Sequence, residues 1–404
     1  MKRVSTGFVA PSSSCNNASC GCGSLVGRDY RESNYLNFVS GIVNQDSYLR
    51  WPCEEANPKG LSNPQNLDNA EICFESLEGP DFFKLGLELS GSKYLTRMLY
   101  LKDPRITGKI FDGVIGSIFK LMTDQNGHYL FGKLIRFCDD IQLQFIVAKI
   151  TVKSESFINA AKDRWGSISI KNLIKVLERS HYVSSLIVPL YDGFYGLMID
   201  RIGSSVVVKC IDILDTATTV LLYQAAIKYC LELATNEKGY FSLNNFITNS
   251  KGLRRQQLLD LISENSLFLA LDPYGNFVLQ HVLKLHNPFL IEKICSGLKG
   301  HYIRLSQLKV SSHVVEQCID SVGIKYVLFD FLRSNDLIKV AQNQYGNYVI
   351  QQALKIAKQT DNPFYHNLLM KLEPLLDSKY QPSYGLRVVN FIKKEIPVRN
   401  AMIN

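Results

Sequence analysis

The 404-residue sequence lacks the marks of a membrane protein, a secreted protein and a metal-dependent or nucleophilic enzyme. No stretch approaches the roughly 18 apolar residues that a membrane-spanning helix needs, and the first residues, MKRVSTGFVAPSSSC, contain no apolar core of a secretion signal. The seven histidines show no metal-ligand spacing with cysteines or acids, and no G-x-S-x-G motif occurs. We therefore expect no membrane contact, no metal, no cofactor and no enzymatic activity. Because no long Lys/Arg run marks a nuclear protein, we expect a cytoplasmic location.

Paired cysteine motifs are also missing, although the chain has ten cysteines. Three of them, Cys15, Cys20 and Cys22, lie in a segment rich in Ser, Asn and Gly and lack the CxxC spacing of a zinc site. Four others fall in apolar helical segments: Cys138, Cys210, Cys230 and Cys318. We expect these four to be small buried hydrophobes that stay reduced.

What the sequence does contain is a repeated phrase. DPYGNFVLQHVLKL, at 272–285, returns as NQYGNYVIQQALKI at 343–356. Its central position recurs at intervals of 35 to 39 residues: Gly91, Gly127, Gly166, Gly203, Gly239, Gly275, Ser311, Gly346 and Gly385. A fixed period of this length is typical of stacked repeats. We call these positions anchors, and the first eight define repeats 1 to 8.

Each repeat has the pattern of helices separated by short turns. Three residues before most anchors stands Asp or Asn, which predicts a cap for the helix that follows. Positions +3, +4, +7 and +8 from the anchor are mostly apolar, as in Val206, Val207, Cys210 and Ile211. That spacing is typical of a buried helical stripe. The sequence therefore predicts an all-α superhelix.

The chain divides into two parts by composition. Residues 1–75 are rich in Ser, Asn, Gly and Pro, show no helical period, and hold six basic against eight acidic residues. We expect them to form a disordered or loosely structured leader. Residues 76–404 hold 39 basic against 29 acidic residues, a net charge of +10. This excess suits a polyanionic partner but does not identify one.

Positions +1, +2 and +5 are expected to project together from the face opposite the buried stripe, since each residue advances about 100° around a helix. In repeats 6 to 8 these positions hold one flat residue between two polar ones: Asn276, Phe277 and Gln280; Ser312, His313 and Glu316; Asn347, Tyr348 and Gln351. Two polar groups one turn apart can reach the edge of one unpaired base, and a ring beside them can stack on its face. Ionised Glu is acceptor-only, which matches the N–H donors of guanine, whereas Gln suits uracil or adenine.

The phrases YGNFVLQ, SSHVVEQC and YGNYVIQ resemble the repeats of the Pumilio (PUF) family of RNA-binding proteins, and the resemblance extends over residues 76–397. It implies a right-handed, crescent-shaped α-solenoid of about eight repeats, with a C-terminal capping half-repeat near residue 385. It further implies that RNA runs antiparallel to the protein. Asn347/Gln351 would then read U, Ser312/Glu316 G and Asn276/Gln280 U, in the order 5′-UGU-3′. Phe277, His313 and Tyr348 would stack on the bases.

The same resemblance implies a biological role. We expect a monomer that binds single-stranded, UGU-containing messenger RNA in 3′ untranslated regions and regulates its translation or stability through effector proteins. Two alternatives stay open. One is a helical-repeat scaffold for protein interactions, and the other is a binder of structured or ribosomal RNA with weak sequence preference.

Repeats 1 to 5 depart from the pattern at +5, where they hold Thr96, Gly132, Lys171, Val208 and Asn244. We expect these repeats to keep the scaffold and to have lost most of the base code. Weaker RNA contacts, to the backbone or by stacking, are expected at nine residues: Lys93, Tyr129, Lys133, Lys171, Lys209, Tyr240, Phe241, Asn244 and, in the capping half-repeat, Arg387.

Overall fold

The computed structural model describes residues 74–377 and 383–395. In these residues every regular element is a helix and no strand occurs. The predicted leader, 1–75, lies almost wholly outside the described residues, as do Cys15, Cys20 and Cys22. The division at residue 76 therefore stays a prediction.

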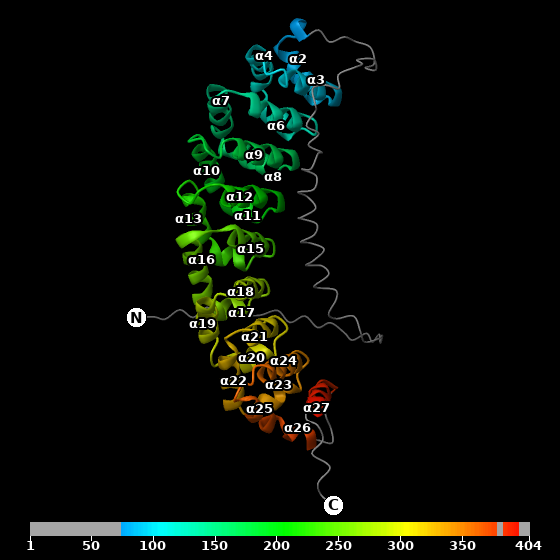
Figure 1. Cartoon of the computed structure of the whole chain (residues 1–404), viewed down its shortest axis with the longest axis vertical. Coiled ribbons are helices and arrows are strands. Elements are labelled where there is room, and N and C mark those ends of the chain that lie inside the picture. Colours follow the sequence, from blue (N-terminus) through cyan, green and yellow to red (C-terminus); the bar gives the residue numbers. More distant parts are fainter. Residues whose placement is uncertain (1–73, 378–382, 396–404) are drawn as a thin grey trace, which may run out of the picture. The chain divides into compact units, whose positions relative to one another are not determined.

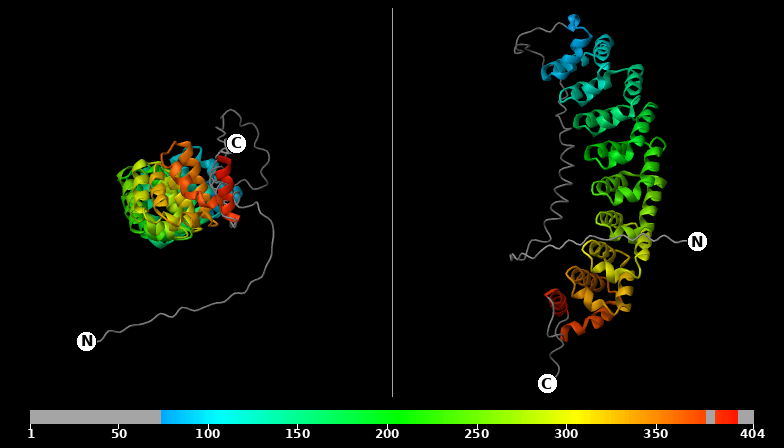
Figure 2. Two further views of the ribbon diagram at one scale, coloured as in Figure 1. Left: turned by 90° about the horizontal axis from the view of Figure 1, so that it is seen from below. Right: turned by 180° about the vertical axis from the view of Figure 1, so that it is seen from behind.

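Each of the eight repeats consists of three helices in order (Figures 1 and 2). The first helices are α2 (Gly79–Leu87), α5 (Ile118–Thr123), α8 (Ser154–Lys162), α11 (Phe194–Met198), α14 (Cys230–Ala234), α17 (Ser266–Leu271), α20 (Tyr302–Ser306) and α23 (Leu337–Ala341). The second helices are α3 (Leu89–Leu99), α6 (Gly127–Phe137), α9 (Arg164–Val176), α12 (Arg201–Ile213), α15 (Gly239–Asn249), α18 (Gly275–Leu283), α21 (Ser312–Ile319) and α24 (Gly346–Gln359). The third helices are α4 (Pro104–Ile115), α7 (Asp140–Thr151), α10 (Val183–Asp192), α13 (Val220–Lys228), α16 (Gly252–Glu264), α19 (Pro288–Gly297), α22 (Ile324–Arg333) and α25 (Tyr365–Leu372).

Three further helices complete the described residues: a 3-10 turn at Phe74–Ser76, α26 (Pro374–Asp377) and α27 (Ser383–Glu395). The second helices pack side by side in chain order from α3 to α24, and α27 packs on α24 as the next member of the row. Figure 1 shows the third helices α7 to α19 along the opposite edge of the stack. The prediction of an all-α repeat solenoid with a capping half-repeat is confirmed.

The Asp or Asn three residues before the anchor caps the second helix, as the pattern predicts. In repeat 6, Oδ1 of Asp272 accepts hydrogen bonds from the backbone N–H groups of Tyr274 (2.8 Å) and Gly275 (2.7 Å). Five other repeats form the same pair of bonds through Asp124, Asp163, Asp200, Asn236 and Asn343. These bonds satisfy N–H groups that the start of a helix leaves without a partner.

Replacing Asp272 by Ala is expected to lower the free energy of unfolding by about 1 kcal/mol, because two backbone donors lose their acceptor. Asn at this position should retain most of the stability, since Asn236 and Asn343 form the same bonds in repeats 5 and 8. Urea unfolding followed by circular dichroism measures both variants. Equal losses for Ala and Asn would contradict a capping role.

The anchor glycines mark a close approach of the first and second helices. A Cβ atom placed on Gly127 would lie 2.5 Å from the carbonyl oxygen of Leu121, and one on Gly239 would lie 2.7 Å from that of Leu233. Non-bonded atoms of this kind need roughly 3.5 Å. Repeat 7 has Ser311 instead, and its hydroxyl donates a hydrogen bond of 2.7 Å to the carbonyl of Ala270 in repeat 6.

The predicted apolar stripe forms the core between helices. Val206, Val207, Cys210 and Ile211 are buried, as are the equivalent residues of repeat 8. All five cysteines in the described residues are free thiols, and burial raises the pKa of Cys210 to about 12.

No helix in the described residues has the length and apolarity to cross a membrane. Within the same residues, no group of three His, Cys, Asp or Glu side chains is placed to hold a metal ion.

Candidate nucleic-acid interface

The two amides of repeat 6 face each other on α18. The Nδ2 of Asn276 donates to the backbone oxygens of Asp272 (3.0 Å) and Pro273 (2.9 Å). Its Oδ1 accepts a 2.9 Å hydrogen bond from Nε2 of Gln280. The Asn side chain is thus fixed by its own helix and holds the Gln amide beside it.

Repeat 8 forms the same arrangement on α24. Asn347 Nδ2 donates to the backbone oxygens of Asn343 and Gln344, both at 2.9 Å. Gln351 Nε2 lies 3.2 Å from Asn347 Oδ1. Repeats 6 and 8, which are not adjacent in the stack, therefore present the same type of amide pair in a similar geometry.

The +1 side chains are less exposed than the helical pattern predicts, which corrects the expectation that +1, +2 and +5 project together. Asn276 and Ser312 are 3% exposed and Asn347 is 0% exposed. Position +1 lies one turn before +4 and two turns before +8, both of which belong to the buried stripe. The +1 group thus lies at the edge of the core, while the +5 side chains beside it are half-buried.

Repeat 7 differs in chemistry but not in placement. Ser312 is buried at +1 of α21, and Glu316 at +5 keeps 27% of its side chain exposed. The Nδ1 of His313 lies 3.3 Å from Oε2 of Glu316. This repeat therefore presents a carboxylate where its neighbours present amides.

The +2 residues are exposed in all three repeats, as expected. Phe277 is 40% and Tyr348 39% exposed, and His313 also reaches solvent. From the capping helix α27, Arg387 Nη1 donates a 2.7 Å hydrogen bond to the hydroxyl of Tyr348. The Arg387 guanidinium also lies over the rings of Tyr348 and Tyr384.

The lysines predicted as weaker contacts in repeats 1 to 4 differ in their surroundings. Lys93 is exposed. Lys133 donates to the hydroxyl of Tyr100 (2.9 Å), and Lys171 donates to Ser205 Oγ (3.2 Å). Lys209 forms an ion pair of 2.7 Å with Asp212, which neutralises its charge locally. Among these lysines, the charge of Lys209 is thus offset by a neighbouring carboxylate.

The remaining predicted contacts are aromatic or amide side chains. Tyr129 is exposed, whereas Tyr240 and Phe241 on α15 are half-buried. Asn244 Nδ2 lies 3.5 Å from the backbone oxygen of Phe277, and Asn244 Oδ1 is buried without a hydrogen-bond partner.

A family model described as a Pumilio-family RNA binding repeat matches residues 117–151, 229–263, 267–285 and 337–361. Pumilio homolog 18 of Arabidopsis thaliana is 30% identical over 281 residues, which cover 68% of this chain and 85% of that protein. The chain belongs to the Pumilio family. Pumilio homolog 12 of the same plant is 32% identical over 373 residues, or 91% of this chain and 62% of the relative. The chain spans between about half and two thirds of the length of the first such relatives.

Solved structures share the Pumilio fold of this chain. The Puf4 RNA binding domain, bound to an HO endonuclease RNA 3′ UTR recognition sequence, has a TM-score of 0.68 at 23% identity. It covers 77% of this chain and 98% of its own. The RNA-binding domain of yeast Puf5p, bound to SMX2 RNA, has a TM-score of 0.64 at 18% identity, covering 80% and 98%. At these identities the likeness establishes the fold.

Sequence reasoning missed an aromatic cluster in repeats 2 and 3 of this Pumilio-family chain. His128 at +1 of α6 is buried and stacks on Trp165, with ring centroids 4.6 Å apart and planes at 25°. The Arg164 guanidinium lies over the Trp165 indole, 4.6 Å from the ring centroid. Burial lowers the pKa of His128, which favours the neutral form of the ring. The signal was Trp165 directly before its anchor, where repeats 6 and 8 have Tyr274 and Tyr345.

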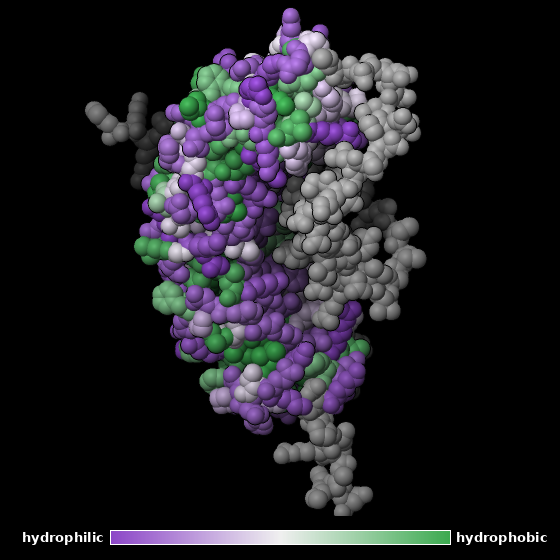
Figure 3. Space-filling model, turned by 45° about the horizontal axis from the view of Figure 1, so that its top comes forward, coloured by the Kyte–Doolittle hydropathy of each residue, from purple (hydrophilic) through white to green (hydrophobic). Residues whose placement is uncertain are grey.

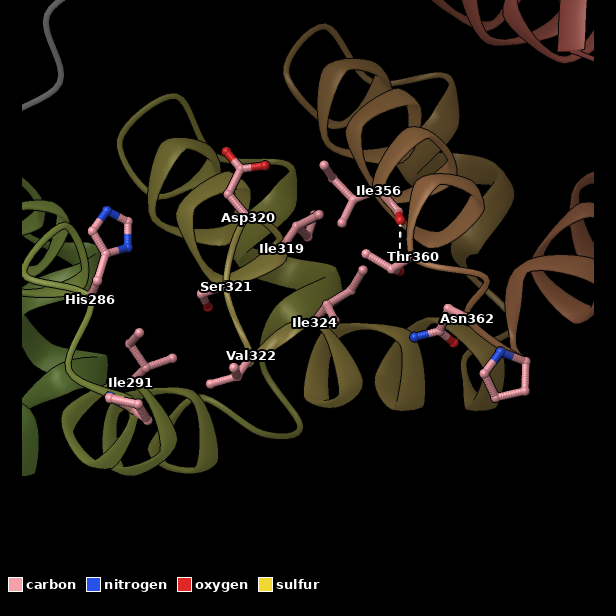
Figure 4. Close-up of a pocket in the computed structure, with 12 residues that line it drawn as sticks. His286, Ile291, Ile319, Asp320, Ser321, Val322, Ile324, Ile356, Thr360 and Asn362 are labelled. Carbon is pink, nitrogen blue, oxygen red and sulfur yellow. Dashed lines mark hydrogen bonds between the residues drawn. The ribbon is translucent and has the colours of Figure 1, made fainter.

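A cleft of about 590 Å³ lies where the second helices of repeats 6 to 8 lead into the third helices (Figure 4). Ile291, Ile319, Ile324 and Ile356 supply much of its lining, and Asp320 adds a charge at its border. None of the base-edge or stacking candidates lines it. Figure 3 shows one face of the described residues, which is mostly hydrophilic and has apolar residues in separate patches.

Proposed function

We propose that this chain is a sequence-specific, single-stranded RNA-binding protein that reads a UGU core. One observation carries the proposal. On α18 and α24 a +5 amide lies against a +1 amide beside an exposed ring at +2. On the helix between them, α21, the partly exposed Glu316 lies beside the exposed His313. Such a unit matches one unpaired base, with its edge on the polar pair and its face on the ring.

Each pair suits one base. Gln280 and Gln351 each carry a donor and an acceptor, which suit the N–H and C=O groups of uracil. The +1 amide beside each holds it in place. Glu316 offers acceptors only, which match the adjacent N–H groups of guanine. In the family's antiparallel order, Tyr348 would stack on the first base, and His313 and Phe277 on the following two.

Membership in the family supports a role in post-transcriptional regulation. We propose that the chain binds 3′ untranslated regions of messenger RNA in the cytoplasm, as a monomer, and regulates translation or stability through effector proteins. Lys93 and the other basic residues of repeats 1 to 4 would contact the RNA backbone with little sequence preference. The net charge of +10 outside the leader supports binding of a polyanion.

Binding of a short RNA that contains UGU, compared with the same RNA carrying ACA, tests the proposal. We expect at least a hundredfold weaker binding to ACA, because each edge contact discriminates by roughly 1–3 kcal/mol in duplex DNA and three contacts are lost together. Fluorescence anisotropy at fixed salt measures both affinities. Equal affinities would contradict base reading.

A second candidate is a protein-binding scaffold, which the apolar cleft in repeats 6 to 8 favours. The two candidates differ in whether the purified protein retains RNA. Crosslinking in cells distinguishes messenger RNA from structured or ribosomal RNA.

A further inference from the structure

Three aromatic rings stack at the junction of repeats 5 and 6. Tyr240, at +1 of α15, lies against Phe277 with ring centroids 5.2 Å apart and planes at 29°. It also stacks on Tyr274, at 6.0 Å and 18°. Tyr240 occupies the position where repeats 6 to 8 have Asn, Ser and Asn. A large ring therefore stands where the reading repeats carry a small polar group.

The contact leaves no room for a base between the two rings. Stacked carbon atoms are roughly 3.5 Å apart, so a base held between two rings needs them about 7 Å apart. Tyr240 and Phe277 are separated by 5.2 Å between centroids. Because α18 packs between α15 and α21, Tyr240 covers Phe277 from the repeat 5 side.

The +5 side chain of repeat 5 makes a different contact from those of repeats 6 and 8. Asn244, at +5, directs Nδ2 toward the backbone oxygen of Phe277. Its Oδ1 is buried. In repeats 6 and 8 the +5 amide lies instead against the +1 amide of its own helix. Repeat 5 therefore lacks the paired edge that its neighbours present.

We propose that Tyr240 ends the base-reading track. It takes the stacking face of Phe277 that the next nucleotide would need, so that the nucleotide beyond the base on Asn276/Gln280 is turned out and not read. This inference rests on the proposed UGU reading. With RNA antiparallel to the protein, the unread nucleotide is the fourth, on the 3′ side of the triplet.

The test compares four RNAs that contain UGUA, UGUC, UGUG or UGUU in one fixed context. We expect the wild-type affinities to agree within about twofold. Since UGU reads the same in both directions, the nucleotide on its 5′ side is varied in a second set, so that selection at either flank is detected. A preference of about tenfold or more for one base at the 3′ flank of UGU would overturn the inference.

Two variants examine Tyr240 directly. The double change Tyr240→Asn with Asn244→Gln gives repeat 5 the residues of repeats 6 and 8, and we expect it to prefer UGUU by about tenfold, as expected for one edge contact. Asn244→Gln alone leaves Tyr240 on Phe277, and we expect no preference. A fourth-base preference in the single variant would contradict the role of Tyr240.

These outcomes separate this inference from the proposed function. If the wild type fails to distinguish UGU from ACA, the proposed function is wrong. If it distinguishes them and also selects the fourth base, only the inference about Tyr240 is wrong. Thermal unfolding checks that the variants fold. If the double variant fails to fold, the comparison of the four RNAs with the wild type still decides the question.

Discussion

Replacing Glu316 by Gln is expected to reduce the preference for G at the middle of UGU by about tenfold to a hundredfold. A carboxylate offers acceptors only, and two of them match the adjacent donors of guanine, whereas an amide places a donor against one of those donors. The loss corresponds to one bidentate edge contact, roughly 1–3 kcal/mol. The measurement compares binding to UGU, UAU and UUU, with the flanking uracils unchanged.

Glu264→Gln is the matched control, because it removes the same charge from the third helix α16, away from the reading helices. Glu264 pairs with Lys293, which retains its other partner, Asp260. This variant should bind all three RNAs as the wild type does. An unchanged preference for G in the Glu316 variant would mean that other residues recognise the middle base.

A methyl group added at an anchor should destabilise the stack. In Gly127→Ala the new Cβ would lie 2.5 Å from the backbone oxygen of Leu121, and neither helix can yield by rotating a side chain. We expect the free energy of unfolding to fall by about 1–3 kcal/mol, as for other overpacked cores. Chemical denaturation measures the change without reference to RNA.

Gly108→Ala provides a control of opposite sign. Gly108 lies inside α4, and a Cβ built there meets no atom within 4 Å. Alanine in a helix interior is favoured over glycine by about 0.5–1 kcal/mol, so this variant should be slightly more stable than the wild type. Destabilisation of similar size in both variants would mean that the anchor is not a site of close approach.

The local parts of the fold were predictable because their causes are local. An Asp three residues before a helix start caps that helix wherever the helix packs, so Asp163 and Asp272 could be assigned from spacing alone. The same holds for the apolar stripe, since helical periodicity fixes which residues share a face. Together with the recurrence of the anchor, these two signals predicted the repeats and their helices.

The details of the candidate site depend on neighbouring helices and were not predictable in this way. Spacing places Asn347 on one side of α24, but only the packed helices show that it is covered while Tyr348 stays exposed. The contact of Tyr240 with Phe277 joins residues 37 positions apart, and no period in the sequence encodes a ring distance. The ion pair between Lys209 and Asp212 also depends on their side-chain conformations, which the sequence does not give.

The caps have a consequence for how the molecule opens. Six second helices are capped by an acceptor from their own repeat, and each repeat packs chiefly on its immediate neighbours. One end of the row can therefore unfold while the other repeats stay folded. Backbone amides of α3 and α6, which begin the row of second helices, should then exchange with deuterium whenever that end of the row unfolds. Amides of α18, flanked on both sides, should be protected for longer, so loss of the first repeats leaves α18, α21 and α24 in place.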